Sequence, residues 1–171
     1  DMYNGQGKYT YADGTVFEGN YIDNQMHGHG ILYHANGDYY EGNFRNSMMD
    51  GEGLFKHGDS ITYEGMFHAD QKSGVGRIEF HDTGETYEGD FINNTMTGHG
   101  VMCWANGNKL EGKFENGNPV EGWLYLTNDV FPCRAEFKAS GEMFNGHPTF
   151  IVTITRGILK HTCRFLNGSI L

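Results

Sequence analysis

A five-residue phrase recurs five times along this chain and constrains its fold more than any other feature. It consists of an aromatic residue or Leu, then Glu-Gly, then any residue, then an aromatic residue. The five glutamates are spaced 23, 23, 24 and 23 residues apart, at Glu18, Glu41, Glu64, Glu88 and Glu111. A fixed period of this length indicates a repeat protein, in which each repeat packs on its neighbours and the array presents one extended surface.

A second phrase, Gly-x-Gly, follows each of the first four glutamates by ten residues. Interior glycine weakens a strand, so its recurrence needs a packing cause. We expect each glycine pair to leave a slot that accepts a Tyr or Phe ring from an adjacent strand. The four pairs are Gly28/Gly30, Gly51/Gly53, Gly74/Gly76 and Gly98/Gly100.

Each repeat is predicted to contain two short strands and two turns, with no room for a helix. In a strand, alternate residues share a face, so Phe17, Gly19 and Tyr21 point the same way. The pair Asn36-Gly37 is typical of a two-residue type I′ hairpin turn. The expected fold is all-β: stacked hairpins of about 23 residues in one elongated, single-layer, twisted antiparallel sheet.

The repeated phrase, together with His27-Gly28-His29-Gly30, resembles the MORN repeat (membrane occupation and recognition nexus) over about residues 3–118. The resemblance implies a single-layer sheet of β-hairpins. It also implies scaffolding roles, such as anchoring at membranes or the cytoskeleton and gripping partner peptides in an aromatic groove. The chain departs from the family's pattern in its mid-repeat loops, which lack the basic pair that the family often carries.

The sequence predicts two regions. Residues 1–118 form the repeat array: a partial first repeat around Gly5-Gln6-Gly7 and five further repeats, of which the fifth is degraded at Leu110. Residues 119–171 are read as degenerate hairpins that cap the array and protect its strand edge. The alternatives for this second region are a separate binding segment or part of a further domain. The start in mid-repeat suggests a fragment of a longer protein.

Charge limits the partners. The chain has a formal net charge of -10, and residues 1–118 hold 18 Asp and Glu against 7 Lys and Arg. Nucleic acids and anionic lipids are bound by clusters of Lys and Arg. We therefore expect no nucleic-acid partner and no direct binding to an anionic membrane.

Cysteine usage and hydropathy suggest the compartment. The three cysteines, Cys103, Cys133 and Cys163, have neither zinc-ligand spacing nor the even count of a disulfide framework. No apolar run reaches 18 residues, and no signal peptide opens the chain. The expected location is the cytoplasm, with association to the cytoskeleton or a membrane.

No residue pattern predicts catalysis. The repeated Glu residues should lie about 10 Å apart in neighbouring repeats, too far for a retaining acid/base pair. His27 and His29 share a strand face, but nothing completes a tetrahedral metal site. Gly-x-Gly is followed by no helix that would cradle a phosphate. We therefore expect no enzyme activity, no catalytic residue, no cofactor and no metal.

The predicted functional site is a groove lined by one aromatic stripe. Stacking should align the rings, and a single layer cannot cover them by itself, so an exposed stripe would mark an interaction site. The predicted partner is a protein segment, an amphipathic helix or an extended peptide, with basic flanks. The groove residues are Phe17, Tyr21, Tyr40, Phe44, Tyr63, Phe67, Tyr87, Phe91 and Phe114.

Alternatives remain open at this point. The rings could pack only on one another and on the glycine slots, or be covered by residues 119–171 or by a second copy in a homodimer. The leading function is a non-catalytic protein-interaction scaffold in a cytoskeletal or membrane-associated assembly. The alternatives are a phospholipid or membrane-attachment module and an accessory repeat region of a larger enzyme.

Overall fold

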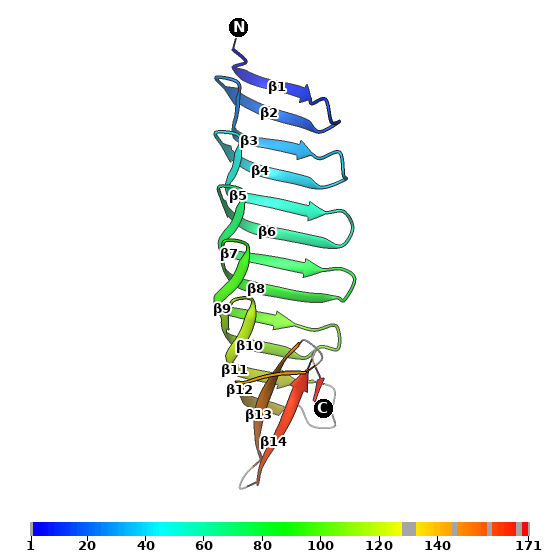
Figure 1. The fold of residues 1–171 in the computed structure, drawn as a ribbon, viewed down its shortest axis with the longest axis vertical. Coiled ribbons are helices and arrows are strands. Elements are labelled where there is room, and N and C mark those ends of the chain that lie inside the picture. Colours follow the sequence, from blue (N-terminus) through cyan, green and yellow to red (C-terminus); the bar gives the residue numbers. More distant parts are fainter. Residues whose placement is uncertain (1, 128–132, 145–146, 157–158, 167–168, 171) are drawn as a thin grey trace. The chain divides into compact units, whose positions relative to one another are not determined.

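The computed structural model describes residues 2–127, 133–144, 147–156, 159–166 and 169–170. Throughout these residues the backbone forms strands and turns and no helix (Figure 1). The strands follow one another in chain order within one sheet, and the observed pairings are antiparallel. The predicted all-β, single-layer sheet of hairpins is therefore confirmed.

The contacts of the chain divide it into two compact units. Unit 1 comprises residues 1–82 and 91–94, and unit 2 comprises residues 83–90 and 95–171. The strands whose residues all belong to unit 1 are β1 (Gly5–Thr10), β2 (Val16–Ile22), β3 (Gln25–Tyr33), β4 (Tyr39–Arg45), β5 (Met48–His57), β6 (Ile61–His68) and β7 (Gln71–Phe80). Strand β8 (Glu85–Ile92) contributes residues to both units.

Unit 2 continues the hairpin pattern beyond the regular repeats. Its other strands are β9 (Thr95–Cys103), β10 (Lys109–Glu115), β11 (Asn118–Leu126), β12 (Cys133–Phe144), β13 (His147–Arg156), β14 (Leu159–Leu166) and β15 (Ser169–Ile170). Hairpins were predicted for residues 119–171, and β11 to β14 pair antiparallel there. Pro119 lies in β11 at a register irregularity, where a missing N–H is tolerated. That this region caps the array stays a prediction.

The predicted glycine slots are present at the second glycine of each Gly-x-Gly pair, whereas the first glycine, such as Gly28, has positive φ and no ring beside it. A β-carbon on Gly30 would lie 2.5 Å from the ring of Phe17 in the adjacent strand β2, closer than real side chains approach. Gly53 stands in the same relation to the Tyr40 ring, at 2.4 Å, and Gly76 to the Tyr63 ring, at 2.6 Å. The aromatic ring of each repeat thus occupies the space that a glycine side chain leaves empty.

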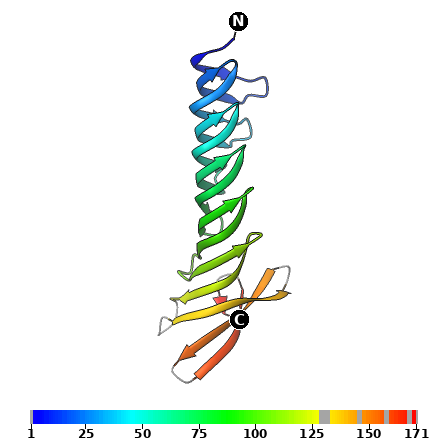
Figure 2. The ribbon, with the colours of Figure 1, turned by 90° about the vertical axis from the view of Figure 1, so that its left-hand side faces the viewer.

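The hairpins of unit 1 stack one after another in chain order (Figure 2), and the ring distances along single strands show that the strands bend toward the face that carries the rings. Tyr40 and Phe44 are four residues apart on β4, a separation of about 13 Å in a straight strand. Their ring centroids are only 5.1 Å apart. The bend occurs over Gly42, which has no side chain to obstruct it, and it defines an inner face that bears the rings and an outer face opposite.

The two-residue turns lie elsewhere than predicted. Asp23 and Asn24 both have positive φ, 49° and 68°, as do the equivalent residues of later repeats. At the predicted type I′ position, only Gly37 has positive φ. His34 and Gly37 instead belong to a longer turn, in which Gly37 N–H donates to His34 O at 3.0 Å and His34 N–H donates to Asp38 O at 2.8 Å. Asn and Asp tolerate the left-handed region, which allows two-residue turns without glycine.

Four of these turns are also linked to the preceding part of the chain by a reciprocal pair of hydrogen bonds. Met49 N–H donates to Asp70 Oδ1 at 2.7 Å, and Asp70 N–H donates to Met49 O at 3.0 Å. The same arrangement joins Tyr3 to Asn24, Met26 to Ser47 and Lys72 to Asn94. At the equivalent turn of the fifth repeat, Gly117 makes only the backbone bond, to Met96 O at 2.9 Å. A polar residue at the second turn position thus adds a second bond, and sequence analysis did not find this role.

Candidate functional site

The nine predicted groove residues form the core of their units. Phe17, Tyr40, Tyr63, Tyr87 and Phe114 are 0 % exposed, and the most accessible of the nine is 8 % exposed. In unit 1 the rings contact edge to face between neighbouring repeats, with centroids 5.0–5.1 Å apart. The structure thus brings the rings together as expected, but they fill one another's space. A partner would have to contact the residues beside them.

Most of the tyrosines in these rows also use their hydroxyl groups internally. Tyr40 donates to Asn43 O at 3.0 Å, and Tyr63 donates to Met66 O at 3.0 Å. Burial raises the pKa of Tyr63 to about 12. These phenols stay neutral at physiological pH and serve the fold, which leaves them no acid/base role.

A groove of about 460 Å³ runs over the inner face of unit 1. Side chains of Met26, Leu32 and Phe44 lie at its floor, and half-buried Met49 lies beside them. The hairpin turns supply its polar walls: Tyr11, Asp13, Thr15 and His34 from one end of the hairpins, and Ser47 and Asp70 from the other. The groove therefore combines an apolar floor with acidic and polar walls.

A lysine replaces methionine farther along the same face. Met26 pairs with Tyr21, Met49 with Phe44 and Lys72 with Phe67, so the three occupy equivalent positions. The Lys72 ammonium lies 5.4 Å from the centroid of the Tyr63 ring and 5.8 Å from that of Phe55. Burial lowers the pKa of Lys72. This amine is held over aromatic faces, where cation–π attraction offsets part of its lost hydration.

The outer face of unit 1 carries the repeated glutamates. Glu18 and Glu41 each pair with Ile31 across the ladder, and Glu41 and Glu64 each pair with Leu54. Carboxylates and aliphatic side chains therefore alternate in one row. Exposed apolar side chains lie on the same face: Ile22, Met48, Met66, Val75 and Ile92, which are 39–62 % exposed.

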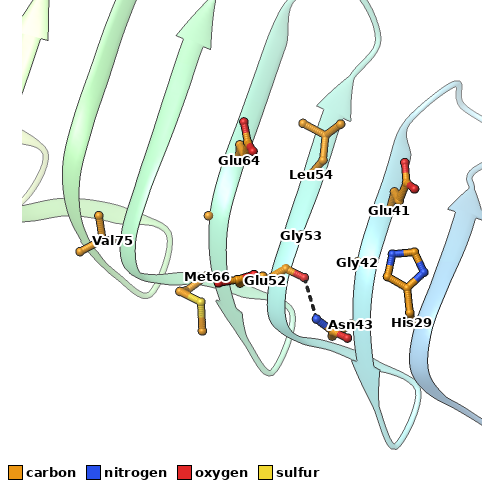
Figure 3. A pocket seen from close by; sticks show the side chains of 11 residues that line it. His29, Glu41, Gly42, Asn43, Glu52, Gly53, Leu54, Glu64, Met66 and Val75 are labelled. Atoms are coloured by element: carbon orange, nitrogen blue, oxygen red, sulfur yellow. Dashed lines mark hydrogen bonds between the residues drawn. The ribbon is translucent and has the colours of Figure 1, made fainter.

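A hollow of about 630 Å³ lies on this outer face (Figure 3). One wall is the row of Glu41, Leu54 and Glu64, and the other contains Asn43, Glu52, Met66 and Val75. Sequence analysis considered the glutamates only as catalytic candidates and did not predict this hollow. The available signal was the aliphatic residue that follows the first two Gly-x-Gly phrases, Ile31 and Leu54, which register places between two glutamates; after the third phrase this residue is Arg77.

Neither a metal centre nor a membrane-spanning helix occurs in the part of the chain that the structure describes. No three His, Cys, Asp or Glu side chains come close enough there to hold a metal ion. Among the same residues, no helix has the length and apolar character to cross a bilayer.

The fold and the repeated motif define a repeat protein built from β-hairpins that interlock through aromatic rings and glycines. The sequence model of the MORN repeat matches residues 1–16, 17–39, 40–60, 63–84 and 87–109. The chain belongs to the MORN-repeat family. Members of this family are known in membrane and protein-interaction settings and are generally non-enzymatic. None of the curated proteins matches the chain.

Proposed function

We propose that this protein is a non-catalytic interaction scaffold and that the inner groove of unit 1 binds a protein segment. The observation that supports this proposal is the groove itself, with its floor of Met26, Leu32 and Phe44. Its volume of about 460 Å³ falls within the roughly 300–1,000 Å³ typical of binding pockets. An amphipathic helix or an extended peptide would place apolar side chains on this floor.

The charges around the groove specify the flanks of the partner. Asp13 and Asp70 stand at opposite walls, and the array as a whole is acidic. Complementary charge speeds association and fixes register. The proposed partner therefore carries Lys or Arg beside its apolar residues. Such a module would serve in a cytoplasmic assembly at the cytoskeleton or a membrane, attached through protein contacts, because an anionic bilayer repels an acidic surface.

The proposal can be tested without knowing the natural partner. Random peptides displayed on phage are selected against the protein, and the selected peptides are titrated against Met49→Arg and Met66→Arg. Met49 lies in the inner groove and Met66 on the outer face, so the two variants add the same charge to opposite faces. We expect Met49→Arg alone to weaken binding by about tenfold or more. Peptides that bind Met49→Arg as well as wild type would show that the groove is not the site.

A further inference from the structure

The outer face of unit 1 offers a second interaction surface, independent of the groove. Its centre is Leu54 on β5, which is paired with Glu41 on β4 and with Glu64 on β6. Directly opposed side chains in a sheet start about 4.5–5.5 Å apart. The two carboxylates therefore flank one leucine within a stretch of about 10 Å.

The opposite wall of the hollow adds exposed apolar surface. Met66 is 39 % exposed and Val75 is 62 % exposed. Asn43 Nδ2 donates to the main-chain oxygen of Glu52 at 3.2 Å, which holds this wall together. Gly53 lies between the walls and presents only backbone to the hollow, because a side chain there would point to the inner face, toward Tyr40 (Figure 3).

The carboxylates at the hollow outnumber the cations: Arg77 lies opposite Glu64 in the register but forms an ion pair with Glu79, and His29 also lines the hollow. Glu41 accepts a hydrogen bond from the neutral Tyr39 hydroxyl at 2.5 Å, and neither Glu52 nor Glu64 forms an ion pair among the residues that the structure describes. Other acidic residues in unit 1 are paired: Glu18 with Lys8 at 3.3 Å, Glu79 with Arg77 at 2.7 Å, and Asp50 with Arg45. An excess of negative charge thus coincides with exposed apolar surface.

The spacing of the row indicates the form of a partner. Glu41 and Glu64 lie two strands apart, a separation of about 9.6 Å along the sheet. Seven residues of an α-helix rise about 10.5 Å and return to nearly the same face. A helix lying across the strands would therefore place residues i and i+7 over the two glutamates, and residue i+3 or i+4 over Leu54.

We propose that this outer face binds a basic amphipathic helix with Lys or Arg at i and i+7 and an apolar residue between them. The aliphatic stems of Lys and Arg lie along Leu54 and Met66 while their charged ends reach the glutamates. The apolar residue at i+3 or i+4 covers Leu54. The surface would therefore prefer helices whose basic residues recur every seven positions. This preference distinguishes specific binding from general attraction between a basic peptide and an acidic protein.

The test uses synthetic helical peptides of about 20 residues, long enough to be helical in water. The first peptide carries Lys at heptad spacing with Leu at i+3 and i+4. The second has the same composition with the lysines moved off that face, and the third carries Glu in place of Lys. Affinities are measured by fluorescence anisotropy at low and physiological salt, because screening weakens exposed charge pairs.

Protein variants then locate the binding. Glu41→Gln combined with Glu64→Gln removes the two charges from surface positions at little cost to the fold, and Met49→Arg alters only the inner groove. We expect the first peptide to bind about tenfold or more tightly than the second, to lose that advantage on the Gln variant and to keep it on Met49→Arg. Equal binding of the first two peptides, loss of binding on Met49→Arg, or no binding of the first peptide would each overturn the proposal. These outcomes leave the inner-groove proposal to its own test.

Discussion

The ring of Tyr40 lies directly over Gly53, so that a β-carbon added to Gly53 would come within 2.4 Å of the ring. The two residues belong to adjacent strands, β4 and β5, and are joined through the cross-strand pair Gly42 and Gly53. The ring is 0 % exposed because it packs into this slot and against Phe44 and Phe67. A single-layer sheet thus obtains a core by bending over its own rings.

This relationship predicts a strong effect of adding a side chain at Gly53. In Gly53→Val the new methyl groups would displace the Tyr40 ring, and such overpacking typically costs about 1–3 kcal/mol. The matched control is Gly7→Val, because a β-carbon on Gly7 would meet only Tyr21, at an ordinary 3.9 Å. Urea unfolding should show a lower midpoint for Gly53→Val and little change for Gly7→Val. Equal midpoints for both variants would contradict the slot argument.

The fold was predictable because the repeat supplies many consistent local signals. The period, the shared parity of Phe17, Gly19 and Tyr21, and the glycine slots all follow from residue types and strand geometry. The positions of the two-residue turns could not be derived from residue types in this way. Ala69 and Ser47 adopt positive φ there, a conformation that these residue types disfavour. Reciprocal hydrogen bonds to the preceding hairpin hold these turns, and such bonds depend on tertiary packing.

The candidate site was harder to predict for a related reason. The sequence shows which side chains share a face, but not how far the strand bends. With a straight strand, Tyr40 and Phe44 would line an open stripe. The bend at Gly42 closes the stripe and moves the accessible surface to Met49 on the inner face and to Leu54 on the outer face.

The reciprocal hydrogen bonds at Asp70 give a second prediction. Asp70→Gly removes the side-chain acceptor of Met49 N–H while relieving the positive φ of 64° at this residue. Asp70→Asn keeps an acceptor oxygen and serves as the control. A lost hydrogen bond costs about 1 kcal/mol, so Asp70→Gly should unfold more easily in urea than Asp70→Asn. Equal or greater stability of the Gly variant would show that the side-chain bond contributes nothing.

Lys72 gives a third prediction. Its pKa is lowered by burial, so the unfolded chain holds this proton more tightly than the folded one. At neutral pH the buried charge therefore destabilises the fold, and stability recovers as the pH rises through the folded-state pKa toward 10.5. Lys72→Met, which restores the residue type of Met26 and Met49, should raise the thermal midpoint modestly at pH 7 and by less at pH 10. An unchanged or lower midpoint at pH 7 would show that the cation–π contacts outweigh the lost hydration.

The buried tyrosines predict loss of stability at alkaline pH. Burial raises the pKa of Tyr63 to about 12 from its ordinary value of 10.0. A group with a raised folded-state pKa contributes fully below its unfolded pKa, so this contribution is present below about pH 10 and is lost toward about pH 12. Tyr63→Phe keeps the ring but cannot ionise, and Phe17 occupies the equivalent position naturally. Circular dichroism across this pH range should show that unfolding begins at a higher pH in Tyr63→Phe than in the wild type. At pH 7 the variant should be less stable, because it loses the hydrogen bond to Met66 O. Identical alkaline transitions in the two proteins would mean that Tyr63 ionises without opposing the fold.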